Sequence, residues 1–195
     1  SFFFSHSASR IPHSEQIDTM QTRVAYFGLV GGASGDMLLS ALLEAGFKRG
    51  SLHRLISHLG IGEVRISVSK AGAGHIKASK IKFSTKKDIN LSFEQIRNLL
   101  IRAKISNVVR EKALGTYNCL MRAEETVHGH SHRDFKFQHL GEIDAIIEIT
   151  SFWQALEELG ILECFCSYFP LSNTSPATMQ LLKGRRVRFV DWGYE

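Results

Sequence analysis

Residues 28–37, which read GLVGGASGDM, constrain the fold of this chain more than any other segment. They follow an apolar segment at residues 23–27 that has the pattern of a buried strand, and they precede apolar residues at helical spacing over residues 38–43. Three glycines within five residues permit positive φ and a close approach of the backbone. Ser34 is suited to cap the helix with its side chain. The segment therefore predicts a glycine-rich turn between a strand and a helix.

Two interpretations of this turn remain open, a capped turn and a ligand-binding turn formed by Ser34, Gly35 and Asp36. A helix N-terminus can bind an anion, but no lysine follows the last glycine as in a P-loop, and the G-x-G-x-x-G motif is missing. Asp36 complements the helix dipole and would repel a phosphate unless a cation lay between them. If Gly35 has a positive φ, valine at this position is expected to unfold the turn.

Hydrophobic periodicity indicates an α+β fold. Helices are predicted over residues 35–46, 52–59, 92–103, 106–127, 142–159 and 177–182. Strands are predicted at residues 23–27, at 64–68 and 76–83 as an antiparallel hairpin, and at 161–169 as a buried strand. This order predicts a mixed sheet with packed helices, an opening βα unit and an antiparallel hairpin.

Residues 1–20 show no hydrophobic periodicity, and we expect a disordered extension there. The domain is expected to cover residues 21–195. A length of 195 residues suffices for one sizeable core or for two small ones, so a division into two subdomains near residue 105 stays open.

Charge and hydropathy exclude some classes of partner. The formal net charge is +5, but lysine and arginine are spread along the chain, whereas a nucleic-acid surface would be more clustered. A nucleic-acid partner is therefore not expected. No apolar run approaches the length of a membrane span, so we expect no membrane partner.

Cys164 and Cys166 are two residues apart in the last predicted strand, which places their side chains on the same side. The chain has three cysteines, an odd number, so we expect no disulfide framework. We therefore expect a cytoplasmic location. Cys166 could add a soft metal ligand, but we interpret a single strand cysteine as a small core residue.

A histidine-rich segment separates the two longest predicted helices and reads VHGHSHRD over residues 127–134. Imidazole is a common ligand of nickel, zinc and copper, and His128, His130 and His132 would lie on one side of an extended segment. Asp144 could complete such a site or orient the rings. The alternative is that these histidines are solvated loop residues that bind no metal.

Motifs spread over residues 22–187 carry a family resemblance. They are GASGDM at 32–37, AE at 123–124, VHG at 127–129, GEIDAI at 141–146, LEELGI at 156–161, CS at 166–167, PL at 170–171, PAT at 176–178 and LLKG at 181–184. Together they resemble the pyridinium-3,5-bisthiocarboxylic acid mononucleotide nickel insertion proteins, which complete the pincer cofactor of lactate racemase. The resemblance is to the N-terminal domain of this family.

The resemblance implies cofactor biosynthesis by a nickel chelatase of the lyase class. Nickel would be inserted into a pyridinium bisthiocarboxylate mononucleotide, driven by CTP with Mg or Mn in a C-terminal domain that is absent from this chain. A separate chain could supply that domain, and a homo-oligomer stays open. Nickel ligands are then expected at His128, His130, His132 and Asp144.

The same resemblance implies that Ser34, Gly35 and Asp36 form a turn near the ligand, where Asp36 could hold a divalent ion that bridges to phosphate. Several positions depart from the family's pattern. Gly28 replaces an acidic residue, and FQHLG at residues 137–141 replaces F-H-E-V-G. The alternative function is a non-catalytic metal-binding or interaction module that has kept the fold but lost the second domain.

Overall fold

The computed structural model describes residues 23–29, 32–73, 76–86, 89–129, 141–171 and 175–189. In these ranges the elements follow in the order β1 (Arg23–Phe27), α1 (Gly35–Glu44), α2 (Arg49–Leu59), β2 (Val64–Ala73), β3 (Ile76–Thr85), α3 (Phe93–Arg102), α4 (Asn107–His128), α5 (Ile143–Glu158), β4 (Ile161–Cys166), β5 (Phe169–Leu171), α6 (Pro176–Leu182) and β6 (Val187–Phe189). The predicted α+β class, with its opening βα unit and antiparallel hairpin, is confirmed. The expected extension at residues 1–20 lies outside the described residues.

The strands that the structure describes form three separate two-stranded sheets. β1 and β4 pair in parallel, β2 and β3 form the antiparallel hairpin, and β5 and β6 pair in parallel. Parallel pairing of β1 with β4 requires a long crossover, and the residues between them supply it. The carboxyl ends of β1 and β4 therefore meet at one edge of their sheet.

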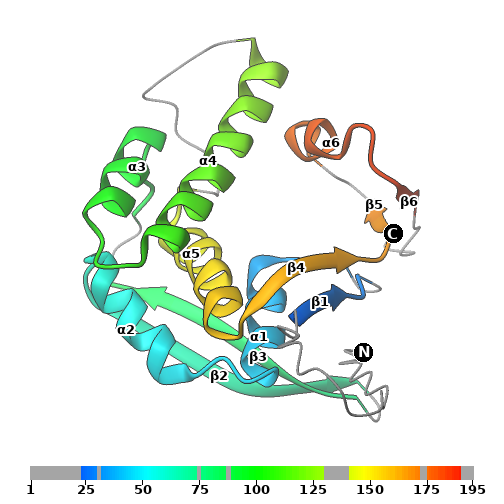
Figure 1. Ribbon diagram of the computed structural model, residues 1–195. Helices are drawn as coiled ribbons and strands as arrows, with labels where there is room; N and C mark the ends of the chain where they lie inside the picture. The colour runs from blue at the N-terminus through cyan, green and yellow to red at the C-terminus, as the bar shows by residue number, and fades with distance from the viewer. Residues whose placement is uncertain are drawn as a thin grey trace, which may run out of the picture.

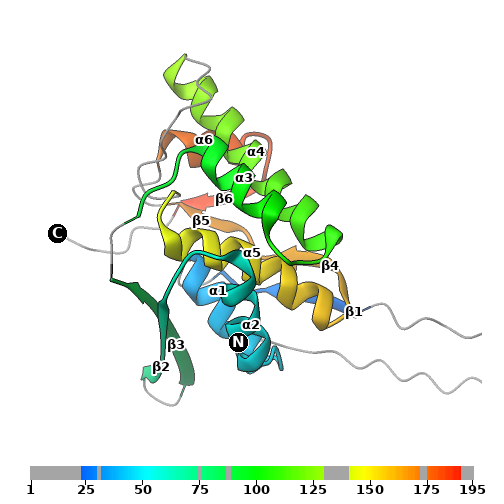
Figure 2. The ribbon, with the colours of Figure 1, turned by 90° about the vertical axis from the view of Figure 1, so that its left-hand side faces the viewer.

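Helix α5 lies at the centre of the molecule, with α1, α4, β3 and β4 around it (Figures 1 and 2). Its residues Ile146, Ile147 and Thr150 are fully buried. Ile146 and Ile147 belong to a hydrophobic core to which α1 contributes Leu39 and β3 contributes Ile81. Any side chain on the inward face of α5 is therefore held by contacts from several elements.

Local signals fix the ends of most helices where the sequence predicts them. Ser92 and Gln95 form a capping box at the start of α3, in which the Ser92 hydroxyl accepts from the Gln95 N–H and the Gln95 side chain accepts from the Ser92 N–H. The Ser106 hydroxyl caps α4 by accepting from the Val109 N–H. Gly60 ends α2 in the left-handed conformation, with φ of 68°.

Strand β4 differs from the expected buried strand. It ends at Cys166, and only Ile161 in it is buried, while Leu162 is 72% exposed. Cys164 and Cys166 are exposed as well, so the interpretation of Cys166 as a core residue was wrong. The apolar composition suggested a strand covered on both faces, as in large parallel sheets. Within the part of the chain that the structure describes, β4 pairs only with β1, which leaves much of its surface uncovered.

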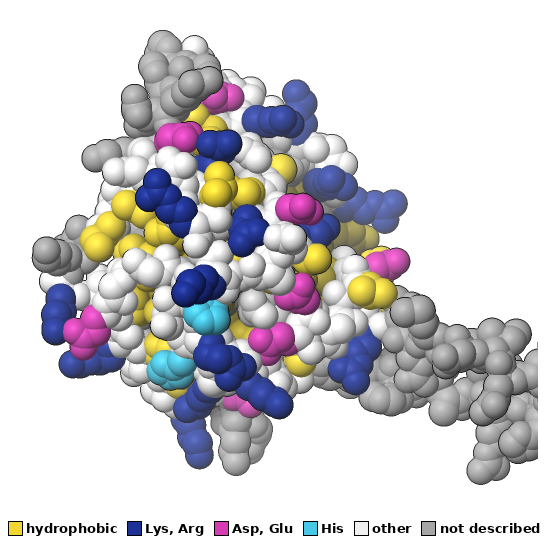
Figure 3. Space-filling model, turned by 60° about the vertical axis from the view of Figure 1, so that its left-hand side comes forward, with side chains coloured by type: hydrophobic (Ala, Val, Ile, Leu, Met, Phe, Trp, Pro, Cys, Tyr) yellow, Lys and Arg dark blue, Asp and Glu magenta, His cyan; other side chains and the backbone are white. Residues whose placement is uncertain are grey.

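Charged side chains are mixed on the surface. On the face in Figure 3, lysine and arginine lie among acidic and apolar side chains instead of forming one continuous patch. This distribution agrees with the even spread of basic residues in the sequence. Among the described helices, none combines the length and the apolar content needed to cross a membrane.

Candidate functional site

Three hydrogen bonds hold the glycine-rich turn at the carboxyl ends of β1 and β4. The Leu29 N–H donates to Ser167 Oγ at 2.9 Å, and the Ser167 N–H donates to the Phe27 carbonyl at 3.0 Å. The Gly32 N–H donates to the Leu29 carbonyl at 3.3 Å, and Gly32 has the positive φ of 90° that the sequence predicted for this turn. The carboxyl edge of parallel strands is where α/β folds bind ligands.

The N-terminus of α1 is organised differently from the prediction. Ser34 occupies the N-cap position, but its side chain accepts no backbone hydrogen bond. Its hydroxyl donates to Asp36 Oδ1, which also accepts from the Met37 N–H at 2.9 Å. The expected Ser34 cap is wrong because the charged Asp36 carboxylate is the stronger acceptor and engages the hydroxyl as a donor. Ser34 and Asp36 thus form one polar unit in front of the helix.

Gly35 is required for close packing and not for an unusual φ. It is the first residue of α1, and it is not among the glycines with positive φ. A Cβ at this position would overlap Glu148 Oε2 and would lie 2.9 Å from the Glu148 Cβ. The turn therefore lies directly against a carboxylate side chain of α5.

Glu148 belongs to a group of three carboxylates. Burial raises the pKa of Glu148 to about 7, and the negative charges of Asp144 and Asp36 add to this shift. Tyr117 on α4 is 1% exposed, and its pKa is raised by burial and then by the charges of Asp144 and Glu148. Side chains from α1, α4 and α5 thus interact electrostatically at one place. A cation there would relieve the mutual repulsion of the carboxylates.

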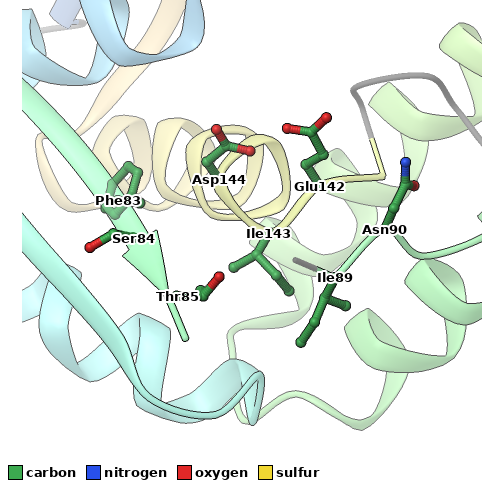
Figure 4. A pocket seen from close by; sticks show the side chains of 8 residues that line it. All are labelled: Phe83, Ser84, Thr85, Ile89, Asn90, Glu142, Ile143 and Asp144. Carbon is green, nitrogen blue, oxygen red and sulfur yellow. The ribbon is translucent and has the colours of Figure 1, made fainter. Parts of the chain in front are cut away.

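A pocket of about 570 Å³ opens beside this group, between the end of β3 and the start of α5. Its lining residues are Phe83, Ser84, Thr85, Ile89, Asn90, Glu142, Ile143 and Asp144. In Figure 4 the carboxylates of Glu142 and Asp144 point to the same side, while Ile143 extends toward Thr85 and Ile89. Asp144 therefore belongs both to the lining of the pocket and to the group of three carboxylates.

The predicted histidine ligands are placed only in part. His128 ends α4, its side chain is 59% exposed, and its Nε2 lies 3.3 Å from Glu124 Oε2. His130 and His132 lie outside the described residues. Among the residues that the structure does describe, no group of three or more His, Cys, Asp or Glu side chains has the arrangement of a metal site. The ligand set of His128, His130, His132 and Asp144 therefore stays a prediction, because two of its four members lie outside the described residues.

The profile of the nickel insertion protein family matches residues 25–187. The chain belongs to the nickel insertion protein family. A relative from Myxococcus xanthus that is named for nickel insertion is 30% identical over 187 residues, which cover 88% of this chain and 48% of the relative. A relative from Thermomicrobium roseum with the same name is 32% identical over 153 residues, which cover 77% and 38% of the two chains.

A third relative carries a more specific name. The pyridinium-3,5-bisthiocarboxylic acid mononucleotide nickel insertion protein of Desulfitobacterium hafniense is 27% identical over 175 residues, which cover 83% of this chain and 44% of the relative. This member of the nickel insertion protein family thus spans about half the length of the relatives it matches. No solved structure matches it.

Sequence reasoning missed Glu148 and Tyr117. Glu148 follows Asp144 by four residues, which places both on one face of α5, and this spacing was the available signal. Tyr117 lies within the helix predicted over residues 106–127 and is buried, but nothing local indicated that carboxylates from α5 lie near its phenol. Both omissions concern contacts between elements that are distant in the sequence.

The raised pKa of Glu148 predicts a pH-dependent effect on stability. A carboxyl group with an ordinary pKa near 4.5 when unfolded and about 7 when folded binds more protons in the folded state between these values. Its contribution to stability is therefore full below pH 4.5 and is lost as the pH rises to 7. Glu148→Gln cannot ionise and should be more stable than the parent at pH 8, by about 1 kcal/mol after allowance for partial contact with water.

Thermal melts of both proteins at pH 8 and pH 4.5 test this expectation. The two stabilities should converge at the lower pH, where the parent Glu148 is protonated. Glu158→Gln is the matched control, because Glu158 is an exposed residue of the same helix whose side chain accepts from Gln154. An equal gain from Glu158→Gln would show that the effect reflects net charge and not the burial of Glu148.

Proposed function

We propose that this chain handles the metal during nickel insertion into pyridinium-3,5-bisthiocarboxylic acid mononucleotide. The observation that carries the proposal is the family match over residues 25–187. That match includes the glycine-rich turn, the carboxylates of α1 and α5, and the pocket beside them. We further propose that full-length members of the family use CTP in this step.

The chemistry requires ligands that hold nickel and then release it. The substrate's thiocarboxylate sulfurs are soft ligands and compete well for nickel against imidazole and carboxylate. We propose His128, His130 and His132 as the first ligands, with Asp144 as a further ligand or as the group that orients them. A loop of histidines can release the metal more readily than a closed cage of four cysteines.

The pocket has the properties expected of a substrate site. Phe83, Ile89 and Ile143 provide apolar walls for a flat ring, and the carboxylates of Glu142 and Asp144 complement the positive charge of a pyridinium. The turn of Ser34, Gly35 and Asp36 would meet the substrate phosphate through a divalent ion held by Asp36. Without that ion, the carboxylates of α1 and α5 would repel the phosphate.

Nickel titration of the intact chain tests the proposal. Neutral imidazole binds nickel, so protons compete with the metal and the affinity should be lower at mildly acidic pH than at mildly alkaline pH. Replacing His128, His130 and His132 together with alanine should remove the tightest site, while the melting temperature of the metal-free protein should change little. Unchanged nickel binding in this variant would refute the histidine assignment, and loss of folding would make the histidines structural.

The alternative is a binding module that has kept the fold without catalysis. The departures from the family's pattern at Gly28 and at residues 137–141 favour this alternative. CTP hydrolysis in the presence of Mg²⁺ or Mn²⁺ distinguishes the two readings. Nickel binding without CTP turnover would support the binding module, and CTP turnover by this chain would contradict it.

A further inference from the structure

The three cysteines are free and exposed, and two of them form a pair. Cys164 and Cys166 lie two residues apart in β4, opposite Ala25 and Phe27 of β1. Because side chains alternate along a strand, both thiols lie on one face of the sheet. Cys119 lies by itself on α4, exposed in the same way.

The spacing of the pair suits a metal bridge better than a disulfide. Residues i and i+2 of a strand have Cα atoms about 6.4–6.8 Å apart, at the upper limit for a disulfide, whose sulfurs must approach to about 2.05 Å. A metal ion with two thiolate bonds of about 2.3 Å joins sulfurs up to about 4.6 Å apart. Two parallel cysteine side chains reach that separation by leaning toward each other, without a change of the backbone.

The pair also lies next to the glycine-rich turn. Ser167 follows Cys166 directly, and its N–H and hydroxyl make the two hydrogen bonds that hold Phe27 and Leu29. The thiols therefore sit at the same carboxyl edge of the sheet as the proposed phosphate-binding turn. Their exposure leaves them open to solvent and to a ligand.

We propose that Cys164 and Cys166 together bind one divalent nickel ion as a pair of thiolates. Two sulfur–nickel bonds form, two thiol protons pass to water, and nickel remains divalent with water in its other positions. The identity of the metal rests on the proposed function, whereas the pairing rests on the strand geometry.

This site would be a sulfur ligand set from which nickel can pass to the substrate. Transfer from a cysteine thiolate to a thiocarboxylate exchanges one soft sulfur ligand of nickel for another, so the metal keeps the same type of ligand.

The test titrates Ni²⁺ into the reduced full chain and follows thiolate-to-nickel charge-transfer absorbance in the near ultraviolet, together with bound metal by equilibrium dialysis. The parent should develop the absorbance. Cys164→Ser and Cys166→Ser should each lose it or weaken the underlying affinity by about tenfold or more. Cys119→Ser is the matched control and should retain the absorbance, because Cys119 is also exposed but lies by itself on α4.

Far-ultraviolet circular dichroism of each variant shows whether it is folded, and Cys164→Ala and Cys166→Ala repeat the test with a different side chain. The proposal is overturned if the parent shows no such absorbance, if the double variant of Cys164 and Cys166 retains it, or if Cys119→Ser loses it equally. The variant without His128, His130 and His132 separates the two proposals. This variant should keep the thiolate absorbance even if it loses the tightest nickel site. If its nickel binding shows that the histidine assignment is wrong, intact thiolate absorbance would still support the cysteine pair.

Discussion

Gly141→Ala should lower the melting temperature by about 6–12 °C, the largest effect expected from adding a single carbon to this chain. The estimate corresponds to about 3 kcal/mol for overpacking at a rigid position and to about 2–4 °C per kcal/mol for a protein of this size. Thermal melts at a fixed pH and protein concentration measure it.

The cause is backbone contact at the junction of α3 and α5. The Leu91 N–H donates to the Gly141 carbonyl at 2.8 Å, and Asn90 forms an isolated bridge with Glu142. A Cβ on Gly141 would overlap Asn90 Oδ1 and the Leu91 carbonyl oxygen. The asparagine side chain can move, but the carbonyl is fixed by the capped start of α3, so the junction has to open. That junction carries Asn90 and Glu142 of the pocket.

Gly115→Ala is the matched control for this prediction. Gly115 lies inside α4, and a Cβ there would meet no atom within 4 Å. Alanine is favoured over glycine in a helix by about 1 kcal/mol, so this variant should melt a few degrees higher than the parent. A melting temperature for Gly141→Ala within about 2 °C of the parent would show that the junction yields and does not position the pocket.

The sequence was sufficient for features that depend on neighbouring residues. The antiparallel hairpin of β2 and β3 was predicted from local patterns and is confirmed, and the Ser92 capping box and the end of α2 at Gly60 likewise depend on neighbouring residues. In each case the deciding interaction joins residues a few positions apart or follows a simple period. Local chemistry was decisive there because no distant element competes with it.

Features that depend on distant contacts were not predictable in this way. Apolar composition indicated a buried β4, but burial depends on whether another layer covers the strand, and most of β4 is exposed. Glu148 resembles an ordinary helical carboxylate in the sequence, and its raised pKa arises only because α1 and α4 lie against α5. The nickel ligands stay a prediction, since His130 and His132 lie outside the described residues.

Gly35→Val should destabilise the chain by about 2–3 kcal/mol, which corresponds to a melting temperature lower by about 5–10 °C. The expectation of an unfolded turn remains, but its cause is contact with Glu148 and not a positive φ. The valine Cβ would overlap Glu148 Oε2 and lie 2.9 Å from both the Glu148 Cβ and Cδ, and its two methyl groups add further volume.

This cause can be tested by rescue, which the junction at Gly141 does not allow because a backbone oxygen is in the way there. Glu148→Ala removes the Oε2 and Cδ atoms that oppose the new side chain but keeps the Cβ, so Gly35→Val should be less damaging in that background by about 1–2 kcal/mol. A double-mutant cycle from thermal or denaturant unfolding measures this coupling. Strictly additive effects would show that glycine is needed at residue 35 for a reason other than Glu148. A large coupling would identify the contact between α1 and α5 as the one that holds the glycine-rich turn against the carboxylates.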